Sequence, residues 1–210
     1  PFSLVHSFCI IQRTMLEAPL RPPVNATLST TGRTLSPLSI YQRSESSKVK
    51  KIVSKLELFI ENPGHGGDEA AAGCLLLGEY AQDDYYRVII VSAGAIRVLA
   101  RILRVFQDNS LVQTAAFFAA VNLCFESTRN QVALEKEGIF DLVVAALKNH
   151  KSCRDVQTNA LIVAYLMSKE QPDLLDGFVG EAPSLLQRAL DISKHDFEED
   201  EVQDIRLWLS

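Results

Sequence analysis

The sequence predicts an all-α protein, a right-handed solenoid of stacked helical repeats that follows a disordered N-terminal leader. Three observations support this prediction. A block of residues recurs after 44 positions, and apolar residues within each block recur at helical spacing. Gly and Pro are few after about residue 67, whereas Ala, Leu and Val are plentiful, a composition that favours helices over sheets.

The internal repeat is clearest in the second half of the chain. The segment 112–116 (VQTAA) returns as 156–160 (VQTNA), and the same shift of 44 carries Gly94 onto Gly138 and Leu103 onto Leu147. A step back by 44 places Ala72 under Ala116, and a step forward by 46 repeats the Val-Gln pair at 202–203. Four registers of one unit indicate stacked repeats.

Each unit is predicted to hold a short helix, a glycine, a medium helix, a polar loop and a longer helix. In the central unit the helices are expected at 85–92, 95–106 and 111–125. Gly94 lies where the chain must turn sharply between two helices, which a Cβ atom would obstruct. Because each unit has an apolar stripe on two helices and cannot bury both alone, neighbouring units must stack.

The repeats do not account for the start of the chain. Residues 1–46 carry Pro, Ser, Thr and Arg with little periodicity, so we expect a disordered or loosely ordered leader. We expect the repeat domain to occupy residues 47–210, with about three to four repeats. The first residue is not Met and the last residues read as helix, so we expect both ends to be cut from a longer protein.

Charge and composition exclude several classes of function. The first 55 residues carry a formal charge of +6 and the remainder −11. An acidic body argues against nucleic-acid binding and favours basic or neutral partners. No apolar run is long enough for a membrane span. The four cysteines are scattered, which predicts a reducing compartment, so we expect a cytoplasmic and/or nuclear location.

No group of residues suggests an enzyme, and we expect no catalytic residues, no cofactor and no metal site. The four histidines have no spacing typical of a zinc site. The acidic run 195–201 is interpreted as the loop before the last helix, where negative charge suits the helix N-terminus. The basic run 48–51 is interpreted as the polar face of an amphipathic helix, with a weak nuclear import signal as the alternative.

Segments 88–96, 112–116 and 122–123 together resemble an armadillo repeat, and segment 132–160 resembles the next one. The resemblance covers about residues 48–210. It implies that the third helix of each unit lines a concave groove. In the importin-α group of this family, a Trp and an Asn four residues later recur on that helix. Here Phe118 and Asn122 have that spacing in one repeat, with Phe in place of Trp, and the neighbouring repeats lack the pair.

The resemblance implies a non-enzymatic scaffold that binds an extended peptide or a helix of another protein. Two alternatives remain open: an import adaptor similar to the importin-α group, and a substrate-recruiting module of a larger enzyme such as a ubiquitin ligase. We also expect association through an exposed apolar edge at the C-terminus, formed by Ile205, Leu207 and Trp208. The expected groove residues are Thr114, Phe118, Asn122, Thr158, Asn159, Ile162 and Trp208.

Overall fold

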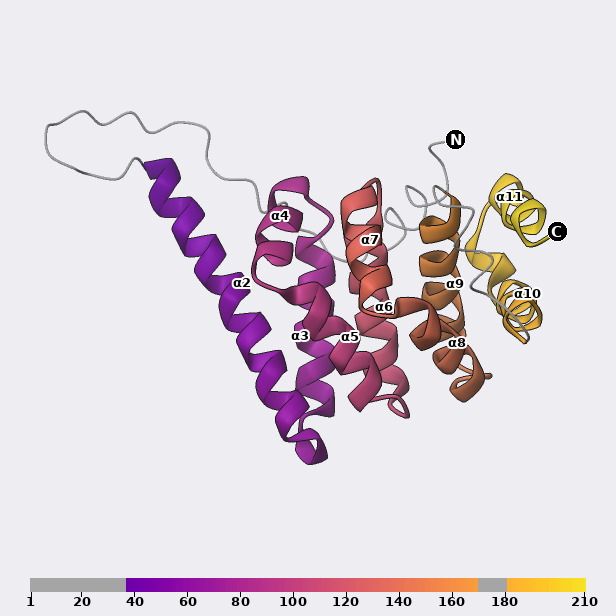
Figure 1. Ribbon diagram of the computed structural model, residues 1–210, viewed down its shortest axis with the longest axis horizontal. Helices are drawn as coiled ribbons and strands as arrows, with labels where there is room; N and C mark the ends of the chain where they lie inside the picture. The colour runs from indigo at the N-terminus through magenta and orange to yellow at the C-terminus, as the bar shows by residue number, and fades with distance from the viewer. Residues whose placement is uncertain (1–36, 170–180) are drawn as a thin grey trace, which may run out of the picture.

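The computed structural model describes residues 37–169 and 181–210, and within these ranges every regular element is helical. Figure 1 shows the helices side by side in a row, with α2 at one end and α10 and α11 at the other. This arrangement is compatible with a helical solenoid, so the all-α part of the prediction is confirmed. Among the described helices, none is both long and apolar enough to cross a membrane.

The helices follow the predicted order. Their bounds are α2 Pro37–Glu61, α3 Gly67–Tyr80, α4 Asp84–Ser92, α5 Ala95–Val105, α6 Ser110–Cys124, α7 Thr128–Lys136, α8 Ile139–Asn149, α9 Arg154–Lys169, α10 Ala182–Ser193 and α11 Glu199–Leu209. Two short 3₁₀ helices, η1 Pro63–His65 and η3 Lys194–Asp196, lie before α3 and after α10.

The triplets α4–α5–α6 and α7–α8–α9 repeat the same local geometry. Gly94 and Gly138 precede the second helix of each triplet with φ angles of 83° and 74°, in the left-handed region that favours glycine. The expected role of both glycines is therefore confirmed. Gly180, the third glycine of the series, lies outside the described residues.

A buried amide closes each triplet in the same way. Gln113 of α6 donates from Nε2 to the carbonyl oxygens of Leu103 and Phe106, at 2.9 and 3.1 Å. Gln157 of α9 donates to those of Leu147 and His150, at 3.2 and 3.1 Å. The acceptors lie at the C-terminal end of the second helix, where carbonyl groups lack a partner within the helix. Each glutamine thus fixes the third helix of its triplet against the second.

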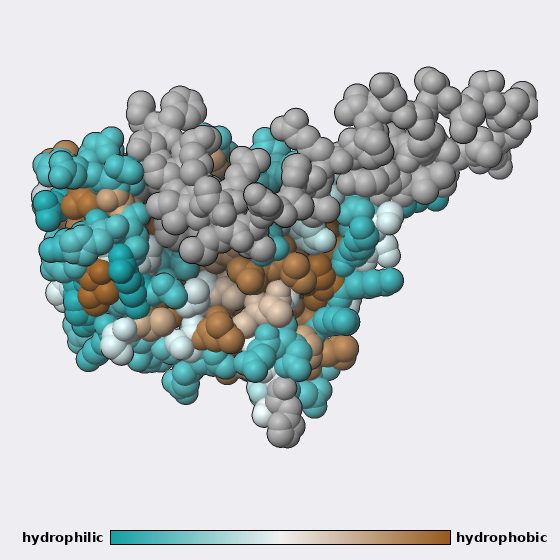
Figure 2. Space-filling view, turned by 180° about the vertical axis from the view of Figure 1, so that it is seen from behind, coloured by the Kyte–Doolittle hydropathy of each residue, from teal (hydrophilic) through white to brown (hydrophobic). Residues whose placement is uncertain are grey.

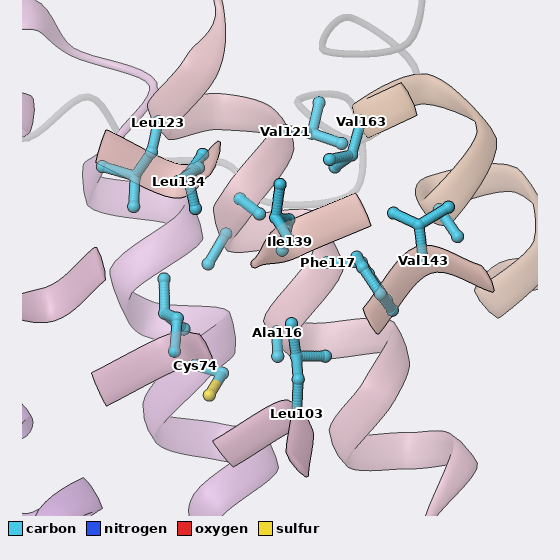
Figure 3. Packing of buried hydrophobic residues seen from close by; sticks show 14 of the residues in the cluster. Cys74, Leu103, Ala116, Phe117, Val121, Leu123, Leu134, Ile139, Val143 and Val163 are labelled. Atoms are coloured by element: carbon cyan, nitrogen blue, oxygen red, sulfur yellow. The ribbon is translucent and has the colours of Figure 1, made fainter. Parts of the chain in front are cut away.

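The hydrophobic core is continuous from one triplet to the next. Figure 3 shows Cys74, Ala116, Phe117 and Val163 among its buried side chains, contributed by α3, α6 and α9. These four residues are fully buried or nearly so. The small side chains along α6 allow its backbone to approach its neighbours closely, which the apolar stripes in the sequence had indicated. Each repeat is therefore stabilised by burial against the repeats beside it.

The N-terminal boundary differs from the prediction. Helix α2 begins at Pro37, where proline suits the first helical turn, so the expected leader ends earlier than residue 46. Glu45 is buried, accepts a hydrogen bond from Tyr86 Oη at 3.0 Å and forms an ion pair with Lys48. Apolar residues recur at helical spacing only from Val49 onward, so the sequence pattern did not indicate this polar contact. Residues 1–36 lie outside the described residues.

Candidate functional site: the third-helix layer

Helices α3, α6 and α9 form one layer, which we call the third-helix layer. It lies behind α4, α5 and α7 in the view of Figure 1. The N-termini of α3 and α6 lie close together, because a Cβ atom on Gly67 would come within 2.8 Å of Asn109 Nδ2. Asn109 itself caps α6 by accepting a hydrogen bond from Val112 N at 3.2 Å. The layer therefore holds three neighbouring helices, of which α3 and α6 start close together.

The face of α6 that carries the predicted residues Thr114, Phe118 and Asn122 becomes less exposed along the helix. Leu111 is 55% exposed, Thr114 is half-buried, and Ala115, Phe118 and Asn122 are 6%, 3% and 2% exposed. Only the N-terminal part of the stripe is therefore open. Whether these side chains contact a partner stays a prediction.

Phe118 packs between two helices of the layer. A Cβ atom on Gly78 of α3 would lie 2.5 Å from Phe118 Cδ1 and 2.7 Å from Cε1. The ring thus occupies the space that the missing side chain of Gly78 leaves free. Burial of the ring and close approach of α3 and α6 stabilise the stack at this point.

Asn122 lies one helical turn after Phe118 and is buried. Its Nδ2 donates to the Phe118 carbonyl oxygen at 3.0 Å. The backbone carbonyl oxygen of Asn122 accepts a hydrogen bond from Arg87 Nη1 at 3.3 Å. Arg87 Nη1 also donates to the backbone carbonyl oxygen of Phe125, at 3.2 Å. Arg87 therefore connects α4 to the C-terminal end of α6.

The equivalent stripe of α9 is buried where it was expected to face a partner. Thr158, Asn159 and Ile162 are 3%, 2% and 1% exposed. Asn159 Nδ2 donates to the Thr114 carbonyl oxygen at 3.4 Å, which links α9 to α6. Its Oδ1 is buried and has no hydrogen-bond partner among the described residues. An unpaired buried acceptor is costly, and Asn159 Oδ1 shares this state with Gln157 Oε1 of the same helix.

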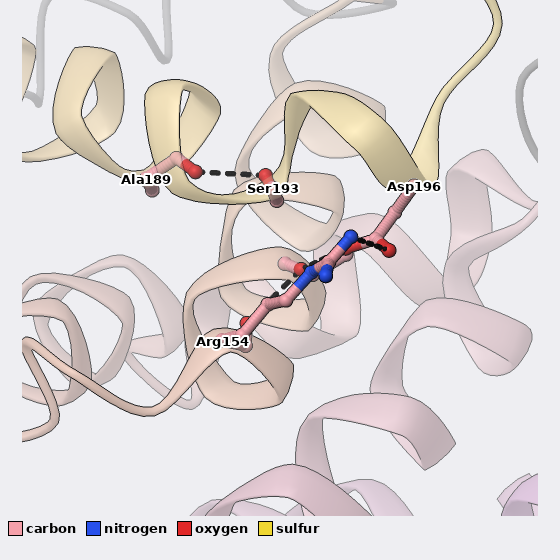
Figure 4. Close-up of polar contacts among 5 residues, drawn as sticks. Arg154, Ala189, Ser193 and Asp196 are labelled. Carbon is pink, nitrogen blue, oxygen red and sulfur yellow. Dashed lines mark hydrogen bonds and ion pairs between the residues drawn. The ribbon is translucent and has the colours of Figure 1, made fainter.

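Thr158 belongs to a polar cluster at the start of α9. Arg154 donates to the carboxylate of Asp196, with Nε to Oδ2 at 2.8 Å, and Thr158 Oγ1 donates to the same Oδ2 at 3.1 Å (Figure 4). Figure 4 also shows Ser193 Oγ donating to the Ala189 carbonyl oxygen, at 2.7 Å. Asp196 comes from η3, so this cluster fixes the last pair of helices against α9. In the structure, Thr158 therefore connects α9 to η3 through its hydrogen bond to Asp196.

Trp208 is half-buried at the C-terminal end of the layer. Its ring meets Tyr165 edge to face, with centroids 5.5 Å apart and an interplanar angle of 85°. Its Nε1 is buried and has no hydrogen-bond partner among the described residues. Ile205 is fully buried, so the expectation that it belongs to an exposed edge is wrong, whereas Leu207 is 63% exposed. Ile205 packs inward because it lies on the opposite face of α11 from Leu207.

The exposed apolar residues of the layer were not predicted from the sequence. Leu75 and Leu76 of α3 are 43% and 42% exposed, and Leu111 of α6 is 55% exposed. Figure 2, which shows the molecule from behind, displays apolar colour near the centre of this face, bordered by polar residues. At positions equivalent to Leu75 and Leu76, α6 has Ala119 and Ala120, which are fully buried against α3. The difference between these leucines and the alanines at equivalent positions was the sequence signal that could have indicated the exposure of Leu75 and Leu76.

Titratable groups give little sign of reactive chemistry in the described ranges. Burial raises the pKa of the Cys74 thiol to about 12, which makes it a core residue and a poor nucleophile. Burial also raises the pKa of the Glu79 carboxyl group. Among the described residues, no group of three or more His, Cys, Asp or Glu side chains is placed to hold a metal ion.

Comparison of the chain with protein-family models, with curated proteins and with solved structures gives no match. The assignment of the helices to a repeat family therefore depends on the repeated residues and their geometry alone.

Proposed function

We propose that this chain is a protein-binding scaffold of the armadillo type, which holds a segment of another polypeptide against the third-helix layer. Two features support the armadillo assignment. The left-handed glycines Gly94 and Gly138 occupy equivalent places in successive triplets, and so do the buried amides of Gln113 and Gln157. A unit of three helices with a glycine before the second helix is what the resemblance implied.

The exposed apolar surface of the layer is the observation that carries the binding function. A solenoid presents an extended surface that suits a long, continuous ligand segment. Leu75, Leu76 and Leu111 supply apolar contact area on that surface. The side-chain carbonyl oxygen of Asn159, buried next to α6, has no partner among the described residues, and a backbone N–H of a ligand that reaches it would supply one.

The acidic body favours a basic or neutral partner segment. Residues 56–210 carry a formal charge of −11, which attracts cationic side chains and repels phosphates. An import adaptor would need a series of Trp and Asn pairs, and only Phe118 and Asn122 keep the spacing. We therefore favour a general polypeptide scaffold over an import adaptor.

Substitution of Asn122 by Ala tests the expected groove. We expect peptide affinity to fall about tenfold, because the ligand loses an amide partner. The free energy of unfolding should change by less than about 1 kcal/mol, because the Nδ2 hydrogen bond to the Phe118 carbonyl oxygen stays within one helix and Ala has a higher helix propensity. Titration calorimetry and urea denaturation measure the two effects. A variant that loses several kcal/mol of stability would show that Asn122 is a core residue instead.

A further inference from the structure

Two helices at opposite ends of the molecule carry exposed faces of opposite charge. The basic face of α2 contains exposed Lys50, Lys51 and Lys55, and ends in Leu58, which is 58% exposed. Together with Arg43 and with Ser46, Ser47 and Ser54, these residues line a hollow of about 630 Å³. Among the described residues that line the hollow, none is acidic.

The acidic face of α11 has the complementary composition. Glu199, Asp200 and Asp204 are exposed, Gln203 lies between them, and the face ends in Leu207, which is 63% exposed. The face is firmly held, because the Glu198–Glu201 capping box fixes the start of the helix and Ile205 is fully buried on the other side.

The two faces match position by position when the helices are placed parallel, with Leu58 beside Leu207. Lys50, Lys51 and Lys55 then lie level with Glu199, Asp200 and Asp204, Ser54 with Gln203, and Glu57 with Arg206. At each of these four levels the two helices carry charges of opposite sign, including the reversed pair of Glu57 and Arg206. The buried anchors Leu56 and Ile205 also coincide, so both helices present the matched face outward.

We infer that the basic face of α2 binds the acidic face of α11 of a second copy of this chain. Figure 1 shows α2 and α11 at opposite ends, so one molecule does not pair the two faces within itself. The contact joins unlike surfaces and is therefore heterologous, which produces head-to-tail assemblies. The leucines at the end of each face add apolar contact to the charge pairs.

Neighbouring charges specify where the second copy sits. Helix α3, at the same end of the molecule as α2, exposes Asp68 and Glu69. These carboxylates repel the acidic face of α11 and direct it onto α2. Because the contact uses α2 and α11, it leaves the third-helix layer, the binding surface of the proposed function, uncovered in each copy.

Sedimentation velocity on the whole chain, from about 10 µM to about 1 mM, tests this inference. We expect association that grows with concentration at about 20 mM salt and weakens at about 300 mM salt, since salt screens exposed charges. A chain that stays monomeric over this range at low salt would overturn the inference. Binding of polyglutamate by such a monomeric chain would assign the basic face to another acidic partner.

Charge reversal identifies the surfaces. The variants K50E/K55E and E199K/D204K should each raise the dissociation constant about tenfold or more, because two attractive pairs become repulsive. The variant K136E/K151E makes the same change in net charge as K50E/K55E at exposed positions elsewhere and should associate like the wild type. Association that survives both reversals, or that is lost in the K136E/K151E control, would contradict the assignment.

Restored complementarity separates a specific contact from damage to the fold. An equimolar mixture of K50E/K55E and E199K/D204K should associate although neither variant does so alone, because each altered face meets its opposite on the other chain. A single chain that carries all four changes should recover self-association. Failure of the mixture and of the combined variant, with far-UV circular dichroism unchanged, would overturn the inference. Peptide binding at the third-helix layer is measured separately, so its loss would not be confused with this outcome.

Discussion

Replacement of Gln113 by Ala is expected to lower the free energy of unfolding by about 2–4 kcal/mol. The Gln113 amide donates to two buried carbonyl groups at the end of α5. Without it, the Leu103 carbonyl oxygen loses its hydrogen bond in an apolar environment. A buried carbonyl left without a partner costs more than the hydrogen bond itself contributed. Urea denaturation followed by circular dichroism measures this loss.

The equivalent substitution in the next repeat is the matched control. Gln157→Ala should cost less, about 1–2 kcal/mol, because the Leu147 carbonyl oxygen keeps a hydrogen bond from Arg188 Nη2 at 2.6 Å. The order of the two effects is a direct consequence of the hydrogen bonds in each triplet. Equal losses, or a larger loss for Gln157→Ala, would show that these amides do not fix the third helices in the way we describe.

Substitution of Gly78 by Ala is expected to destabilise the protein by about 2–3 kcal/mol through overpacking. The new Cβ atom would lie 2.5 Å from Phe118 Cδ1 and 3.1 Å from Ala119 Cα, so both the ring and the backbone of α6 must shift. Phe118→Ala should cost about 3–5 kcal/mol by creating a cavity.

The double variant Gly78→Ala with Phe118→Ala measures the contact itself. Because removal of the ring leaves room for the new methyl group, we expect Gly78→Ala to cost at least about 1 kcal/mol less in the Phe118→Ala background. Strictly additive effects would mean that Phe118 does not pack on Gly78, and its side chain would then be available to a partner as the sequence suggested.

Most of the helical organisation could be predicted from the sequence because it repeats. The shift of 44 residues located Gly94 and Gly138, and the expected helix 95–106 differs from α5 by one residue at its end. The sequence shows the recurring Val-Gln pair, but it does not show that the glutamine fixes the third helix of each triplet against the second. That role depends on where α5 and α8 end relative to α6 and α9, which periodicity does not specify.

The candidate site was harder to predict than the fold. Spacing placed Phe118 and Asn122 on one stripe of α6 and Asn159 and Ile162 on the equivalent stripe of α9, but exposure depends on how closely neighbouring helices approach. Gly78 lets α6 approach α3 so closely that Phe118 is covered, and no pattern within α6 indicates this. Likewise, the exposure of Leu75 and Leu76 follows from the position of α3 beside α2 and from the lack of a preceding third helix among the described residues.

Peptide binding by matched surface variants tests the scaffold proposal most directly. Peptides selected from a random display library on the wild-type chain would be measured by fluorescence anisotropy against two variants. Leu76→Asp with Leu111→Asp alters the third-helix layer, and Val88→Asp with Val105→Asp alters exposed residues of α4 and α5. We expect the dissociation constant to rise about tenfold or more for the first variant and to stay within about twofold for the second. Equal affinity of both variants for the selected peptides would contradict the proposal that the third-helix layer binds the partner.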